Sequence, residues 1–193
     1  MIHRLLLALS LLLALLWPAL ARSQAYEARL PPDLATTPDL CARVPCGDVF
    51  PGAVSFSLRL GQPPYVEAYG GADGRTLLGW VMLSTDITDL PAYSGKPVVT
   101  LIGMDRAGRF VGVKILKHSE PILLLGIPES TLAEFNAQYL GKQVTQTIEV
   151  GPSRPEEGVI GMDAISGATV TVIAQNQVIT SSGQAVARQV GLI

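Results

Sequence analysis

Hydrophobic and polar positions alternate in blocks along the chain, and the first clear blocks predict strands. Leu77 to Leu83 and Pro97 to Met104 are short apolar runs, which are typical of buried strands. Asp105 to Arg109 is polar and contains a glycine, which favours a turn. Phe110 to Leu116 then continues as an extended run, so residues 97 to 116 are predicted to form a β-hairpin.

A helix is predicted after this hairpin, where the apolar spacing changes. Pro128 suits a first helical turn, Leu132, Phe135 and Tyr139 follow at intervals of three and four residues, and Gly141 provides a stop. The apolar stripe of this helix is expected to pack on the sheet.

A longer helix is predicted from about Ala168 to about Val190, with Gly191 at its end and Gly183 as a point where it could be interrupted. Its buried side is expected to hold Ile173, Ala174, Val178, Ala185, Val186 and Val190. Together the elements predict a single α+β domain, in which helices flank a curved, mostly antiparallel sheet.

The N-terminus has a different pattern. A basic start at Arg4, an apolar run from Leu5 to Leu16, and the small residues Ala19 and Ala21 predict an export signal over residues 1–21, cleaved after Ala21. The apolar stretch lies near the lower limit of about 17 residues for a bilayer span, so retention as an anchor stays open. The remaining chain is expected in the periplasm, at the outer face of the inner membrane.

Composition divides the rest of the chain in two. Residues 22–40 place Pro31, Pro32 and Pro38 among polar and small side chains, which predicts a linker that builds no core, and residues 41–193 are expected to form the domain. The formal net charge of −2 gives no attraction to nucleic acid, so no direct nucleic-acid partner is expected.

Cys41 and Cys46 are the two cysteines of the chain. In an oxidising compartment they could form a disulfide, or they could remain two free thiols. Two cysteines at this spacing do not supply an iron-sulfur cluster or a zinc pair, so no metal site is predicted.

The residues with the clearest chemistry lie just before the long helix, in the run Asp-Ala-Ile-Ser-Gly-Ala-Thr-Val-Thr from Asp163 to Thr171. Gly167 would let the backbone turn closely, Ser166 could cap the helix, and the N–H groups from Ala168 onward would face an anion along the helix dipole. A hydroxyl at this position could be esterified to a phosphate. Alternatively, these small residues and hydroxyls simply begin a helix, as they often do.

This run resembles the acceptor motif of proteins that carry covalent FMN: an Asp, two variable residues, Ser or Thr, and then Gly-Ala-Thr. The motif occurs in subunits of the Nqr and Rnf complexes and in NosR. The resemblance implies that a flavin transferase of the ApbE type joins the phosphate of FMN to Thr169 by a phosphoester bond, with Thr171 as the second-choice acceptor. Asp163 would belong to the sequence that the transferase reads, and Ser166, Gly167 and Ala168 to the cofactor site.

A second resemblance narrows the family to NosR and NirI. The segment His118-Ser-Glu-Pro121 is similar to a His-x-Glu-Pro segment of these proteins, and the similarity extends from about Asp39 to the C-terminus. Further segments similar to NosR are Tyr93–Pro97, Leu101–Asp105 and Ile173–Gln177. His118 and Glu120 end an apolar strand, where they would either face the flavin ring or its phosphate or have an ordinary strand-end role. Trp80 and Tyr93 could either stack on the flavin or belong to the core.

The NosR resemblance implies an exported flavoprotein domain that relays electrons in support of nitrous oxide reduction, without a substrate of its own. Membrane electron-transfer components and the nitrous oxide reductase system would be its partners. NosR-type proteins continue into membrane helices and cysteine clusters, so this sequence is expected to be either a fragment or a shortened member of the family. In both cases the electron route through the membrane is expected in another chain. The alternative is a sensory or regulatory binding module, in which the flavin relays no electrons.

Overall fold

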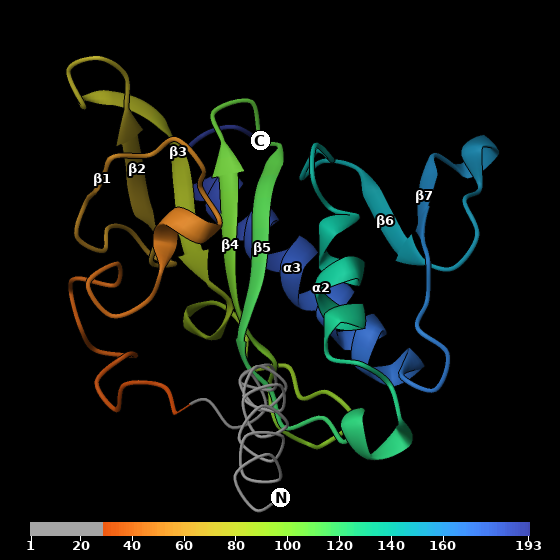
Figure 1. The fold of residues 1–193 in the computed structure, drawn as a ribbon. Helices are drawn as coiled ribbons and strands as arrows, with labels where there is room; N and C mark the ends of the chain where they lie inside the picture. Colours follow the sequence, from red (N-terminus) through yellow and green to blue (C-terminus); the bar gives the residue numbers. More distant parts are fainter. Residues whose placement is uncertain (1–28) are drawn as a thin grey trace, which may run out of the picture.

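The computed structural model describes residues 29–193, and a five-stranded antiparallel sheet of order β1-β2-β3-β4-β5 forms its centre (Figure 1). The strands of this sheet are β1 (Ser55–Phe56), β2 (Val66–Gly70), β3 (Thr76–Leu83), β4 (Val99–Asp105) and β5 (Phe110–Lys117). The helices are α2 (Ser130–Ala137) and α3 (Thr169–Gln189), with 3-10 turns η1 (Cys46–Asp48), η2 (Ser84–Asp86), η3 (Leu123–Leu125) and η4 (Pro155–Glu157). The predicted α+β domain, with helices beside an antiparallel sheet, is confirmed.

The predicted β-hairpin is β4 and β5. Met104 lies opposite Phe110, and between them the side chain of Asp105 accepts hydrogen bonds from the N–H groups of Ala107 and Arg109, both at 2.9 Å. The short polar side chain of Asp105 therefore stabilises the turn that the sequence placed here.

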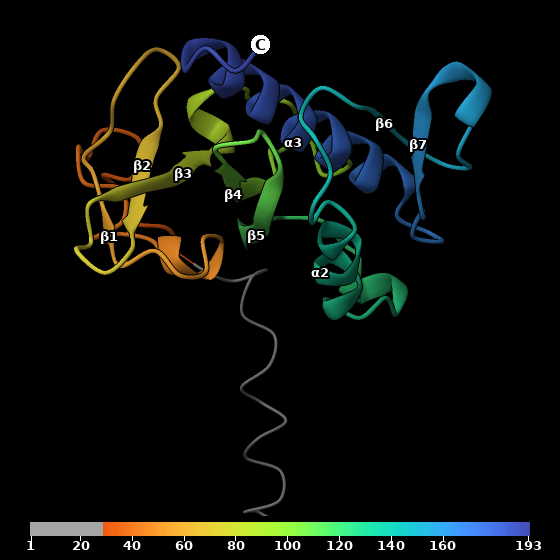
Figure 2. The same ribbon diagram turned by 90° about the horizontal axis from the view of Figure 1, so that it is seen from above.

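Alternate residues of the central strands point to opposite faces of the sheet, and each face has its own core. On one face, Trp80, Met82 and Ile102 pack with α2 and α3. On the other face, Val81 and Leu101 pack with the N-terminal segment. The sheet is the middle of three layers, as Figure 2 shows, with α3 on one side and the orange segment on the other.

The N-terminal layer corrects the linker prediction for part of its length. Leu34 and Leu40 are buried, and Arg59 donates hydrogen bonds to the carbonyl oxygens of Leu34 (2.8 Å) and Thr37 (2.7 Å). The composition of residues 22–40 concealed this because an irregular, proline-containing segment buries single leucines without any periodic pattern. Cys41 and Cys46 lie in the same layer and form a disulfide, which confirms the first of the two alternatives.

Two glycines of the sheet make room for this layer. Gly103 and Gly112 are partners on β4 and β5, and a Cβ atom at either would lie 2.1 or 2.3 Å from the carbonyl oxygen of Val49. Glycine in a strand often marks such a close approach of a second backbone. The N-terminal segment therefore rests directly on the backbone of the sheet.

Helix α3 occupies the predicted range, and most of its predicted buried side is confirmed. Of the six residues named for it, these three are buried: Ala174, Val178 and Val186. Gly183 does not interrupt it: a Cβ atom there would lie 2.7 Å from the ring of Phe110, so this glycine allows close packing. Ile173, predicted to be buried, is 50% exposed, whereas Thr171 and Gln175 are buried. The apolar spacing was wrong for Ile173 and missed the two polar residues, because their side chains are hydrogen-bonded inside the protein.

The shorter helix follows the prediction more closely. Leu132, Phe135 and Tyr139 are all buried against the sheet, and Gly141 has a φ of +79° just after α2. Beyond it, β6 (Thr147–Val150) and β7 (Val159–Met162) form a parallel pair that the sequence did not predict.

The predicted export signal, residues 1–21, lies outside the described residues. Within residues 29–193, no helix combines the length and apolar character needed to cross a bilayer.

Candidate functional site

The segment that leads from β7 into α3 makes a tight turn. The N–H of Ala168 donates to the carbonyl oxygen of Ile165 at 3.0 Å, and Gly167 between them has a φ of +81°. Glycine adopts this left-handed conformation without the steric cost that a Cβ atom brings. Ile165 and Ala168 are buried and fix the turn to the core, whereas the side chain of Thr169 is exposed.

Helix α3 begins at Thr169 without a side-chain cap. Its N-cap residue is Ala168, its first turn holds no acidic residue, and its first hydrogen bond runs from the N–H of Val172 to the carbonyl of Ala168. The three N–H groups of residues 169–171 therefore have no acceptor within the helix. The prediction that Ser166 caps the helix is wrong, because Ser166 lies in the turn, two residues before the N-cap.

A cavity of about 260 Å³ lies beside the start of α3. Its walls are Tyr93, Ile122, Leu125 and the five residues from Gly167 to Thr171. Tyr93 is 65% exposed and Leu125 61% exposed, so large apolar side chains surround its opening. The cavity joins apolar walls to a set of N–H donors, a combination that suits a molecule with an apolar ring and a phosphate.

A buried carboxylate lies behind this cavity. Glu120 has no exposed surface, and its oxygens accept hydrogen bonds from the N–H groups of Tyr93 (3.1 Å) and Ser94 (2.9 Å) and from the hydroxyl of Thr171. Thr171 is itself buried. The two hydroxyls at the start of α3 therefore differ, because that of Thr169 is accessible while that of Thr171 is bonded to Glu120.

A second cavity, of about 180 Å³, lies between β5 and α2. Its lining residues include Ile115, His118, Glu129, Leu132 and Asn136. The Nδ1 atom of His118 accepts a hydrogen bond from the N–H of Glu120 at 3.2 Å, and Nε2 lies 3.7 Å from a carboxylate oxygen of Glu129.

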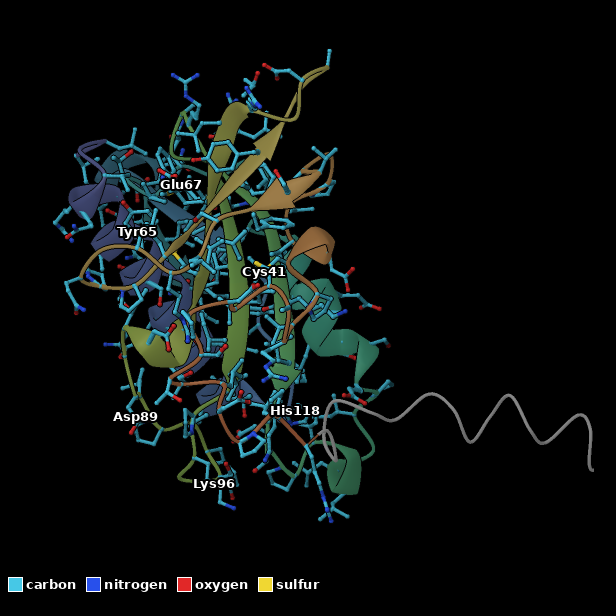
Figure 3. All side chains as sticks on the ribbon, turned by 90° about the vertical axis from the view of Figure 1, so that its left-hand side faces the viewer. Cys41, Tyr65, Glu67, Asp89, Lys96 and His118 are labelled. Carbon is cyan, nitrogen blue, oxygen red and sulfur yellow. A yellow bond between two sulfur atoms is a disulfide. The ribbon has the colours of Figure 1, made fainter. Side chains whose placement is uncertain are left out.

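Burial lowers the pKa of His118 below its ordinary value of 6.5, and this effect exceeds the opposing influence of the Glu129 and Glu120 carboxylates. The imidazole is therefore neutral at pH 7. Figure 3 shows His118 toward one end of the sheet, with Glu67 toward the other.

Comparison with known proteins agrees with this geometry. Residues 93–182 match the FMN-binding domain family. The chain is 40% identical over 144 residues to Regulatory protein NosR of Stutzerimonas stutzeri, covering 75% of this chain and 19% of that protein. It is 41% identical over 120 residues to Regulatory protein NosR of Pseudomonas aeruginosa, covering 62% of this chain and 17% of the relative. The chain is also 31% identical over 120 residues to Protein NirI of Paracoccus denitrificans, covering 62% of this chain and 16% of that protein.

The chain carries an FMN-binding domain of the NosR/NirI type. The matched part of this FMN-binding domain includes Tyr93, Glu120 and the turn before α3, so it contains the residues that form the larger cavity. FMN is accordingly the cofactor expected of the domain. The chain spans less than a fifth of the length of each of these three relatives.

The structure brings some of the predicted site residues together and separates others. Gly167, Ala168 and Thr169 line the larger cavity, and Ser166 is their exposed neighbour. The side chain of Asp163 is exposed, while its backbone exchanges hydrogen bonds of 2.8 and 3.3 Å with the side chain of Gln138.

His118 lines the other cavity, and Trp80 is buried in the core. Sequence reasoning missed Ile122 and Leu125 as walls of the FMN-binding domain's larger cavity. The apolar run after His118-Ser-Glu-Pro121 was the available signal for them. Within residues 29–193, no three or more His, Cys, Asp or Glu side chains gather in a way that could hold a metal ion.

Proposed function

We propose that FMN is attached to this domain by a phosphoester bond to the hydroxyl oxygen of Thr169. The observation that carries the proposal is the position of this hydroxyl: it is exposed, at an uncapped helix start, beside the larger cavity. A transferase can reach it, and no side chain of residues 29–193 caps the helix at this end.

The residues around Thr169 fit the two halves of the cofactor. The N–H groups of residues 169–171 and the positive end of the α3 dipole suit the phosphate. Tyr93, Ile122 and Leu125 offer apolar surface to the ring system. Gly167 keeps the turn clear of side-chain atoms, because a Cβ there would lie 3.3 Å from Ile127.

Electron relay is the role we propose for the attached flavin. When bound, FMN supplies reversible one- and two-electron transfer, while the protein binds and orients it. The similarity to NosR supports a role in nitrous oxide reduction, with membrane electron-transfer components and the nitrous oxide reductase system as partners. An ApbE-type flavin transferase would load the cofactor, and the ester bond would keep it on an exported chain.

We further propose that the domain works in the periplasm, at the outer face of the inner membrane. The N-terminal pattern of residues 1–21 and the Cys41–Cys46 disulfide support export, because disulfides persist in oxidising compartments. N-terminal sequencing of the exported protein should begin at Arg22. Recovery of Met1 in the membrane fraction would instead show that the segment remains as an anchor.

The test of attachment is to produce the full chain together with a flavin transferase. The expected product is yellow, keeps its colour through denaturing gel separation, and gains the mass of one esterified FMN. Breaking a phosphoester requires chemistry, so unfolding alone cannot release the flavin. Complete release on denaturation, or an unmodified mass, would overturn the proposed attachment.

A regulatory module is the second candidate, favoured by the names of two relatives, which are called regulatory proteins. In that case the flavin would not carry electrons between partners. Redox titration and rapid-mixing kinetics distinguish the two, since a relay is reduced and reoxidised quickly by its partners and a regulatory flavin is not.

A further inference from the structure

We propose that Glu120 is a positioning residue that joins three walls of the FMN cavity and, through its buried negative charge, lowers the redox potential of the flavin. This inference rests on the proposed function, because it assigns a role toward the attached FMN. The sequence left two alternatives for Glu120, a contact with the flavin ring or phosphate or an ordinary strand-end role, whereas the structure puts it behind the cavity wall.

The hydrogen bonds of Glu120 connect segments that are far apart in the sequence. Its carboxylate accepts from the N–H groups of Tyr93 and Ser94 and from the hydroxyl of Thr171, across separations of 27, 26 and 51 residues. Tyr93 and Thr171 both line the cavity. The chain after Glu120 supplies the third wall through Ile122 and Leu125. One carboxylate thus sets the spacing between the 93–94 loop, the 120–127 loop and the first turn of α3.

The same hydrogen bonds indicate that the side chain of Glu120 is a negatively charged carboxylate. All three partners are donors to the carboxylate, so both of its oxygens act as acceptors, and that is the pattern of an ionised carboxylate. Glu120 has no exposed surface, so salt and water screen this charge poorly. A fixed negative charge directly behind the cavity wall disfavours the addition of an electron to the flavin.

Glu67 offers a matched control. Its carboxylate also accepts a hydrogen bond from a hydroxyl, that of Tyr69, and it is half-buried. It lies on β2, toward the opposite end of the sheet from His118 (Figure 3). Neutralising Glu67 therefore removes a comparable group without changing the charge near the cavity.

The experiment is redox titration of the FMN-loaded full chain. Glu120→Gln keeps the size of the side chain and removes its charge, so the midpoint potential is expected to become more positive than in the parent protein. Glu67→Gln is expected to leave it unchanged. Thr171→Val removes a donor that partly offsets the charge and should shift the potential in the negative direction, while Thr171→Ser should restore the parent value.

The outcomes separate positioning from a purely structural role. A Glu120→Gln protein with lower thermal stability and an unchanged potential would overturn the inference. If that variant does not fold, the Thr171 pair decides: a shift with Val that Ser reverses supports the inference, and equal potentials reject it. If the parent holds no covalent FMN, the proposed attachment fails, and titration of reversibly bound FMN in the same variants tests Glu120 separately.

Discussion

The cavity at the start of α3 and the cavity between β5 and α2 are both lined largely by apolar side chains, yet they differ in chemistry. The cavity at the start of α3 has the exposed hydroxyl of Thr169 and three N–H groups without helical acceptors. The cavity between β5 and α2 holds His118, which is buried beside Glu129. Apolar volume alone therefore does not mark a cofactor site. An accessible nucleophile and an anion-binding set of donors distinguish one cavity from the other.

The largest expected effect is at Thr169. Thr169→Val keeps the shape of the side chain and removes the oxygen that would bond to phosphorus, so covalent FMN should be lost completely. The helix N–H groups remain, and some FMN can still bind reversibly. Intact mass and flavin fluorescence after denaturing electrophoresis measure the result.

Thr171→Val is the matched control for this prediction, two residues along the same helix. It should retain covalent FMN, at a cost of about 1–3 kcal/mol in the free energy of unfolding, because buried Glu120 loses a hydrogen-bond donor. Attachment that survives in Thr169→Val but is lost in Thr171→Val would move the acceptor by two residues.

A smaller effect is expected at the turn itself. Gly167→Ala forces a Cβ onto a residue with a φ of +81° and should destabilise the fold by roughly 1–3 kcal/mol while lowering the yield of flavinylation. Gly158→Ala is the control, because Gly158 has a φ of +71° with no atom near its Cβ position. Thermal unfolding should respond to both changes. Equal flavin yields in the two variants would argue against a role for the turn in attachment.

The smallest expected effect is a loss of stability at acidic pH, caused by His118 in the cavity between β5 and α2. Because the pKa of His118 in the folded state lies below its ordinary value of 6.5, the unfolded chain binds more protons as the pH falls through this value. Stability should therefore decline below about pH 6.5, and His118→Gln should weaken this decline. Denaturant unfolding between about pH 5 and pH 8 measures it. If the free energy of unfolding of His118→Gln depends on pH as in the parent protein, other titrating groups cause the loss of stability in acid.

The sequence predicted the parts of the fold that repeat a local pattern. The β4–β5 hairpin and the two helices follow from alternation, helical spacing and glycine stops, and the motif ahead of α3 indicated Thr169 as the candidate acceptor. The roles of His118 and Glu120 could not be predicted in the same way. They are two residues apart, yet His118 lines one cavity while Glu120 bonds to walls of the other, through partners up to 51 residues away.

The backbone of Val49 against Gly103 and Gly112 limits how the domain can be shortened. The family match begins at residue 93, but a chain cut there would lose β1 to β3 and would uncover the face of β4 on which Leu101 is buried. Such a fragment would expose apolar surface and an unpaired strand edge, which favours aggregation. A truncated or fused version made for crystallography or electrode studies should therefore begin before Leu34 and keep Gly103 and Gly112 unchanged.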